Sequence, residues 1–186
     1  MLDALQTQLP GIRRDTVIVV HLLGSHGPAY YQRYPPAFAR FTPECRDAQL
    51  ANCSRAAIGN TYDNTIVYTD HILASIIGTL QRDAAHADAA MLFVSDHGES
   101  TGEHGLYLHG APYALAPDEQ TRVPMLLWAA AAFAQRNGLD LACVQARRRQ
   151  ALSHDNFFHI ALGMGDVASA AYRPQLDPLA ACRASR

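Results

Sequence analysis

The sequence predicts an α/β fold with a partly parallel sheet flanked by helices, and three apolar runs lead to this prediction. The runs are short and continuous: "TVIVVHLL" at 16–23, "AAMLFVS" at 89–95 and "VPMLLWA" at 123–129. Such runs are typical of strands that are buried on both faces, as strands of parallel sheets are. A helical pattern separates the first two runs, and strand, helix and strand in this order form a right-handed crossover between parallel strands.

The helical pattern covers the stretch between Asn60 and Asp83. Its apolar side chains recur at helical spacing and its charged side chains take other faces; the apolar ones include Ile66, Leu73, Ile76, Ile77 and Leu80. A second, shorter helix is predicted over 152–165, with Ser153 as N-cap, Asp155 in its first turn and Gly163 near its end. The stretch 24–45 holds four prolines and three tyrosines, too much proline for a helix or a central strand, so a loop is expected there.

Length and composition indicate one folded unit over 1–186. The chain has 186 residues, 49% of them hydrophobic, which suffices for one core, and no repeat or linker divides it. A formal net charge of -2 gives no positive field for polyanions, so nucleic-acid binding is not expected. No run reaches the roughly 18 apolar residues that cross a bilayer, and the first fifteen residues lack a signal-peptide core. We therefore expect nothing in these residues to anchor or export the chain.

Two histidine-rich loops follow the first two apolar runs, where the carboxyl ends of strands would gather a ligand. His26 lies in "GSHGP", and Asp96 and His97 lie in "SDHGE". A carboxylate oxygen and an imidazole nitrogen make half of a zinc site, and Gly98 lets the chain bend away. Further ligands must come from elsewhere, and the nearest candidates are His26, Glu99, Glu103, His104 and His109.

Residue types alone leave a second interpretation open. Ser95, Asp96 and Glu99 could cap a helix, with the histidines on a wet surface loop, and no HExxH spacing excludes this. Other features favour structural roles. These are a core position for His21, a solvated helix face for Arg147, Arg148 and Arg149, a helix start for His154 and Asp155 rather than a place near the site, and loop packing for Tyr30, Tyr31 and Tyr34.

The four cysteines fall into two couples, Cys45 with Cys53 and Cys143 with Cys182. Neither couple has the CxxC spacing of a zinc knuckle or a redox pair. They can form two disulfides in an oxidising compartment or remain four buried thiols, and disulfides are favoured.

Five segments in order resemble the catalytic domain of the phosphoethanolamine–lipid A transferases, in the alkaline phosphatase and sulfatase superfamily. They are "HLLGSHGPAYYQRYPPAFARFTPEC", "NTYDNTIVYTDHIL", "SDHGESTGEHGLYLHG", "PYALAPDEQTRVPMLLW" and "LSHDNFFHIALG". The resemblance implies a zinc enzyme on the periplasmic face of a bacterial inner membrane. It would move phosphoethanolamine from phosphatidylethanolamine to lipid A, part of lipopolysaccharide. The resemblance covers nearly the whole chain.

The resemblance also implies roles for single residues. Asp96 and His97 would ligate the catalytic zinc, and His26 and His109 would line the substrate phosphate or hold a second zinc. The family's short disulfide matches Cys45 with Cys53, whereas the pairing of Cys143 with Cys182 is our own inference. In this family a zinc-activated threonine oxygen attacks the phosphodiester and forms a phosphoenzyme.

The sequence departs from the family in what precedes residue 1. The membrane-spanning domain and the first half of the catalytic domain, with the threonine nucleophile and a glutamate zinc ligand, are not matched. Thr61, Thr65 and Thr101 do not stand in the nucleophile motif. We therefore expect a carboxy-terminal portion that binds zinc weakly, exposes an apolar sheet edge and is inactive without the missing amino-terminal half. The alternatives are a sulfatase-like or phosphodiester hydrolase, or a non-catalytic truncated remnant.

Overall fold

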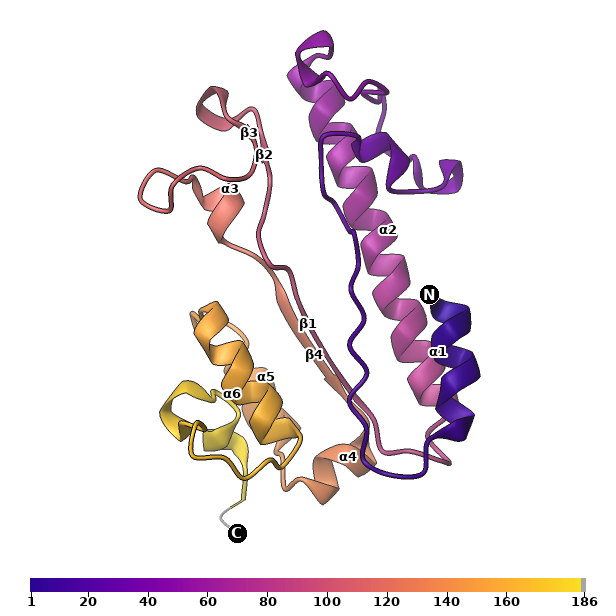
Figure 1. The fold of residues 1–186 in the computed structure, drawn as a ribbon, viewed down its shortest axis with the longest axis vertical. Helices are drawn as coiled ribbons and strands as arrows, with labels where there is room; N and C mark the ends of the chain where they lie inside the picture. The colour runs from indigo at the N-terminus through magenta and orange to yellow at the C-terminus, as the bar shows by residue number, and fades with distance from the viewer. Residues whose placement is uncertain (185–186) are drawn as a thin grey trace.

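The computed structural model describes residues 1–184. Figure 1 shows one long helix, α2 (Arg55–Arg82), on one side and the pair of β1 (Ala90–Val94) and β4 (Met125–Ala129) beside it. The short helix α1 (Leu2–Gln8) lies along the end of α2, and a group of carboxy-terminal helices lies beyond the strands. The α/β class predicted from the sequence is confirmed. Among the described residues no helix has both the length and the apolar character needed to cross a membrane.

Helix α2 begins earlier than the apolar pattern predicted because Ser54 caps it, its side chain accepting a hydrogen bond from the backbone N–H of Ala57. The helix differs between its two ends. Its amino-terminal half buries polar side chains, those of Thr61, Asn64 and Thr65. Its carboxy-terminal half buries Ile76 against α1. The polar half therefore faces the loop that carries candidate site residues.

The strands predicted at 89–95 and 123–129 exist, but they are antiparallel. β1 and β4 pair in register from Ala90 opposite Ala129 to Val94 opposite Met125. A second, smaller ribbon joins β2 (Ser100–Thr101) to β3 (Tyr107–Leu108), also antiparallel. The expected parallel pairing is therefore wrong for the described residues. Two buried apolar runs alone do not distinguish the two directions, because strands of either kind can be apolar on both faces.

The predicted strand at 16–23 is not formed in this structure. The segment passes, in the view of Figure 1, between α2 and the β1–β4 pair, and no described strand pairs with it. Val17 and Val19 are 84% and 88% exposed, and His21 is exposed as well, which corrects its expected place in a core. A strand needs a neighbouring backbone to complete its hydrogen bonds. The apolar pattern of 16–23 is that of a segment able to pair as a strand, but the described residues provide no neighbouring strand for it.

The loop predicted at 24–45 is confirmed, and it continues to the start of α2. Three short 3-10 turns shape it, Tyr30–Gln32, Pro36–Phe38 and Leu50–Asn52. Asn64 of α2 holds its middle by accepting from the backbone N–H groups of Arg40 and Phe41. Tyr30 and Tyr34 are buried, as their predicted packing role requires, whereas Tyr31 is only half-buried. The Cys45–Cys53 disulfide closes the loop on itself.

Four further helices complete the fold. They are α3 (Asp118–Thr121), α4 (Ala131–Arg136), α5 (Leu141–Ala146) and α6 (His154–Met164). The last three pack around a core that includes Leu139, Ile160 and Leu179. Ser153 and Asn156 form a capping box at the start of α6, which confirms the predicted helix start.

The tail of the chain is tied back to this group of helices. The predicted disulfide between Cys143 and Cys182 is present, and a buried ion pair joins Asp177 to Arg183. The three arginines 147–149 are exposed, as predicted, but they follow the end of α5 in a turn and not on a helix face.

Candidate metal centre

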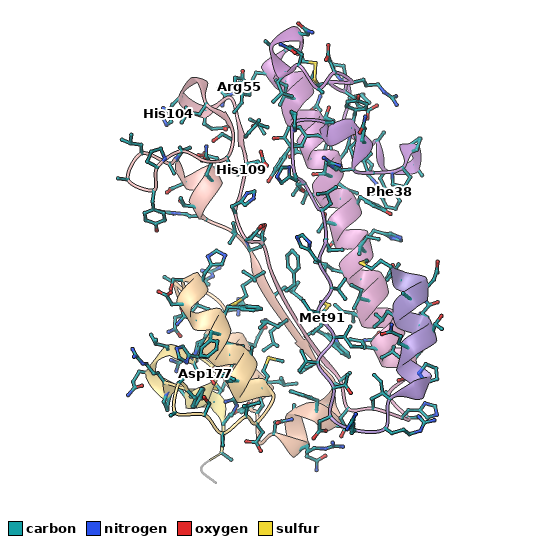
Figure 2. All side chains as sticks on the ribbon, viewed as in Figure 1. Phe38, Arg55, Met91, His104, His109 and Asp177 are labelled. Carbon is teal, nitrogen blue, oxygen red and sulfur yellow. A yellow bond between two sulfur atoms is a disulfide. The ribbon has the colours of Figure 1, made fainter. Side chains whose placement is uncertain are left out.

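Three histidines from separate stretches of the sequence come together beyond the end of β1. Their rings belong to His26, His97 and His109, and one ligand atom from each lies within 4.8 Å of the others. The His97 and His109 rings stack with centroids 3.8 Å apart, and the His26 ring stands edge-on to His109 at 4.9 Å. In Figure 2 the labelled His109 lies near the β2–β3 hairpin, on the side that faces the amino-terminal half of α2. The sequence predicted all three residues as site residues, and the structure brings them together.

The ring nitrogens of these histidines are oriented by their neighbours. Nδ1 of His26 lies 2.7 Å from the carbonyl oxygen of Gly27, and Nδ1 of His97 lies 3.0 Å from that of Gly98. Nδ1 of His109 lies 2.9 Å from Oε1 of Glu99. Each of these acceptors requires a proton on Nδ1, which leaves the lone pair on Nε2 in the neutral ring. Nε2 of each ring is thus left to bind a ligand.

Glu99, a candidate ligand from the sequence, lies behind the histidines and not among them. Its side chain is only 3% exposed and its Oε2 accepts from the hydroxyl of Tyr30 at 2.9 Å. Its Oε1 accepts from the backbone N–H of Gly27 as well as from His109. Burial, and then the adjacent negative charge of Glu99, raise the pKa of the Tyr30 hydroxyl, so that this group stays a donor.

Asp96 is placed beside His97 but points largely to solvent. Its Oδ1 accepts from the backbone N–H of His97, and its Oδ2 is 3.8 Å from Nε2 of the same ring. The side chain is 82% exposed and lies outside the cluster of the three rings among the described residues. The Asp96–His97 zinc pair therefore stays a prediction.

The two remaining candidate ligands on this loop, Glu103 and His104, lie in the turn of the β2–β3 hairpin. His104 has φ 53° and lies exposed at the tip of the β2–β3 hairpin, near Arg55 in Figure 2. Glu103 accepts from the backbone N–H of Thr101 and pairs with Arg55. Burial alone would raise the pKa of Glu103, but the hydrogen bonds that it accepts from backbone N–H groups and from Arg55 outweigh burial and lower it.

The capping alternative for this loop is wrong. None of the described residues 95–99 begins a helix, because this segment connects β1 directly to β2. Gly98 has a reason that the sequence did not reveal: a Cβ there would come 2.0 Å from the carbonyl oxygen of Glu119, so the loop can approach α3 only with glycine.

His154 was assigned from the sequence to the start of a helix, with a place near the site as the lesser alternative. The structure shows both. It is the first residue of α6, and its Nε2 lies 2.8 Å from the carbonyl oxygen of Ser95, the residue before Asp96. The helix start is thereby fixed to the exit of β1, and only the relative position of two segments 59 residues apart reveals this.

The donor set is chemically suited to a transition metal. Three imidazole nitrogens whose tautomers are fixed in advance match the ligands that zinc uses, and a carboxylate hydrogen-bonded to a ligating imidazole is a common support in zinc proteins. Zinc sites that act on substrates keep an open position, and Asp96 stands at the rim with its carboxylate free to turn inward.

Comparison with known proteins shows the family to which the chain belongs. A family model described as Sulfatase matches residues 1–167. The chain belongs to the sulfatase family. Within it, the chain is 43% identical over 184 residues to phosphoethanolamine transferase EptA of Salmonella typhimurium, covering 98% of this chain and 34% of that protein. It is 50% identical over 115 residues to phosphatidylethanolamine transferase Mcr-2 of Escherichia coli, covering 62% of this chain and 21% of that protein.

Solved structures confirm the sulfatase-like fold. The soluble domain of lipooligosaccharide phosphoethanolamine transferase A from Neisseria meningitidis superposes with a TM-score of 0.93 at 42% identity, over 99% of this chain and 55% of that chain. The periplasmic domain of phosphoethanolamine transferase EptC from Campylobacter jejuni gives a TM-score of 0.87 at 40% identity, over 96% of this chain and 56% of that chain. The chain spans about a third of the length of the first curated relatives that it matches.

Proposed function

We propose that this chain is part of a zinc-dependent phosphoethanolamine transferase that moves phosphoethanolamine from phosphatidylethanolamine to lipid A. One observation supports this most directly: three histidines from three segments come together at the exit of β1, and the Nδ1 of each is hydrogen-bonded, which leaves its Nε2 to bind a ligand. The similar proteins carry phosphoethanolamine or phosphatidylethanolamine transferase in their names. The proposed place of action is the periplasmic face of the inner membrane, which fits two disulfides and the periplasmic domain among the similar structures.

In this proposal Asp96 and His97 hold the catalytic zinc, and His26 and His109 face the substrate phosphate or hold a second zinc. A zinc ion in such a centre neutralises charge on phosphoryl oxygens and favours the deprotonated form of an oxygen nucleophile. The protein's part is to keep the three imidazoles oriented and close together. If no second metal is present, a protonated His26 or His109 donates hydrogen bonds to the phosphoryl oxygens as negative charge grows on them.

No threonine of this chain is proposed as the nucleophile. Thr61 and Thr65 are buried in α2, where both donate to backbone carbonyls within the helix. Thr101 is engaged with Glu103 in the hairpin turn. We therefore propose that the nucleophile and the remaining zinc ligands come from the part of such an enzyme that precedes these residues, and we expect no turnover from the 186-residue chain by itself.

The proposal is tested by measuring zinc in the purified chain and in three variants, after dialysis against a weak chelator. His97→Ala and His109→Ala should each retain less zinc than the parent protein. His86→Ala is the matched control, because His86 is exposed, pairs with Asp83 and is not one of the three clustered histidines. Equal zinc content in all four proteins would remove the cluster as a metal site.

Activity is tested separately, by following phosphoethanolamine transfer from phosphatidylethanolamine to lipid A by mass spectrometry. The expected result is no transfer by the chain alone and transfer when the preceding part of the enzyme is supplied. Transfer by the chain alone would contradict the assignment of the nucleophile to another segment. The Sulfatase family match favours one second candidate, a hydrolase of sulfate or phosphate esters, and ester cleavage without transfer to lipid A would select it.

A further inference from the structure

We propose that Tyr30 and Glu99 form a positioning relay that holds the ring of His109 with its proton on Nδ1 and the lone pair of its Nε2 left for a metal. The relay consists of two hydrogen bonds, from the Tyr30 hydroxyl to Oε2 of Glu99 and from Nδ1 of His109 to Oε1 of Glu99, each 2.9 Å long. It joins residues 69 and 10 positions apart in the sequence. The inference rests on the proposed function in one respect, that the cluster binds a metal.

The relay sets the tautomer of His109 because a carboxylate only accepts hydrogen bonds. With Oε1 of Glu99 at its Nδ1, the neutral ring must carry its proton there, so its lone pair is on Nε2. An anionic partner at Nδ1 also makes Nε2 a stronger base toward a metal than a neutral partner would. Glu99 is therefore not one of the three residues of the cluster, and it acts on a metal there through His109.

His109 differs from the other two histidines in what holds it. His26 and His97 are oriented by the carbonyl oxygen of the residue that follows each in the chain, which no side-chain substitution removes. His109 depends on a side chain ten residues away. It also begins the exposed loop after β3, where the backbone at Leu108 has φ 64° and that at Gly110 has φ 103°. The ring most in need of an external support is thus the one that has it.

Tyr30 is what keeps Glu99 in this role. Oε1 of Glu99 serves both Gly27 and His109, whereas Oε2 receives the Tyr30 hydroxyl. Tyr30 is 1% exposed and packs with Ala57 and Ile58 of α2, so its hydroxyl is fixed in place. Without that hydroxyl, Oε2 would be a buried charged oxygen lacking this donor, and the carboxylate would gain by rotating toward another one. Rotation would release Nδ1 of His109.

The relay is tested in the whole chain with two conservative variants and one control. Tyr30→Phe removes only the hydroxyl, and Glu99→Gln removes the charge and keeps the shape. Tyr62→Phe is the control, since the Tyr62 ring packs edge-on against Tyr30 and its hydroxyl makes no hydrogen bond among the described residues. Circular dichroism and thermal unfolding confirm that each variant is folded.

The first measurement needs no metal. Long-range proton–nitrogen NMR spectra of the metal-free protein at about pH 8, above the ordinary histidine pKa, assign the tautomer of each ring. The parent protein and Tyr62→Phe should show His109 protonated at Nδ1. Tyr30→Phe and Glu99→Gln should show a mixture at His109 and no change at His26 or His97. A parent protein protonated at Nε2 of His109 would overturn the inference, even if neither variant folds.

The second measurement is zinc affinity, by competition with a chromophoric chelator. Glu99→Gln should lose about 10- to 100-fold and Tyr30→Phe about tenfold, as hydrogen-bond partners of metal-bound histidines do. Tyr62→Phe should bind as the parent does. A folded Tyr30→Phe with the parent's tautomer and affinity would overturn the relay. A parent chain that binds no zinc would overturn the metal part of the proposed function, while the NMR result would still decide the relay.

Discussion

Two regions of the molecule are each closed by a disulfide, yet they are stabilised in different ways. The site lobe, residues 24–65, buries the polar side chains of Thr61, Asn64 and Thr65 of α2 beside a small apolar cluster around Tyr30 and Ile58. The carboxyl lobe, residues 131–184, buries an apolar core of Ala134, Leu139, Ile160 and Leu179. The histidine cluster borders the site lobe. Among the described residues of the carboxyl lobe, only His154 forms a hydrogen bond to residues 95–99, at the carbonyl oxygen of Ser95.

The difference teaches where directional bonds are needed. Apolar packing stabilises a lobe but fixes no ring orientation, because it is non-directional. The hydrogen bonds that Asn64 accepts and Tyr30 donates fix both distance and direction, and they place the loop that carries His26. We expect substitutions in the carboxyl lobe to change stability without changing metal affinity, and substitutions in the site lobe to change both.

The largest effect is expected for Asp177→Asn in the carboxyl lobe. Asp177 is buried and accepts from Arg183, from the Tyr172 hydroxyl and from the backbone N–H of Leu179. Loss of its charge leaves the nearly buried Arg183 unpaired, which should lower the free energy of unfolding by about 3 to 5 kcal/mol. Chemical denaturation measures this loss.

Zinc affinity of the same Asp177→Asn variant distinguishes the two lobes. It should equal that of the parent chain under conditions where both are folded. The exposed pair of Arg122 and Asp118 offers the control, since Asp118→Asn should cost less than about 1 kcal/mol. Weakened zinc binding in a folded Asp177→Asn would show that the lobes are coupled.

Loss of the disulfide in the carboxyl lobe should also lower the free energy of unfolding more than loss of the disulfide in the site lobe. The Cys143–Cys182 bond spans 39 residues and the Cys45–Cys53 bond spans 8. The chain-entropy relation then gives about 4 kcal/mol for the longer loop and about 2.5 kcal/mol for the shorter one. Each is tested by a paired Cys→Ser variant in urea. A larger loss from the 45–53 pair would contradict the entropic account and point to lost packing around buried Cys45.

Features that depend on local residue patterns could be predicted from the sequence, whereas features that depend on the relative positions of distant segments could not. Helix α2 was predictable from the spacing of its apolar residues, the Cys143–Cys182 pair from the arrangement of the cysteines, and the Cys45–Cys53 pair and the histidines of the cluster from the family resemblance. The direction of β4 beside β1 and the unpaired state of 16–23 were not, because pairing depends on which strands are neighbours. The position of Glu99 behind His109 was not predictable either, because the sequence does not distinguish a carboxylate that binds a metal from one that orients a metal-binding histidine.

A smaller but more informative effect is expected for Asn64→Ala in the site lobe. Asn64 is fully buried and bonds to the backbone N–H groups of Arg40 and Phe41 and to the carbonyl of Phe41. Leaving these groups unpaired should cost about 1 to 3 kcal/mol. Because the loop also carries His26, zinc affinity should fall as well. Unchanged affinity in a folded variant would separate the loop's stability from the site's geometry.

The smallest effect is a pH dependence from Tyr34. Burial, and then its hydrogen bond to Glu44, raise the pKa of Tyr34 to about 12. The folded state thus favours the neutral phenol, so this contribution is complete below the unfolded pKa of about 10 and is lost as the pH rises toward 12. The urea midpoint of the parent should therefore fall more steeply between about pH 10 and 12 than that of Tyr34→Phe. Tyr113→Phe, at a ring 87% exposed, should follow the parent, and parallel curves for all three proteins would show that Tyr34 does not contribute.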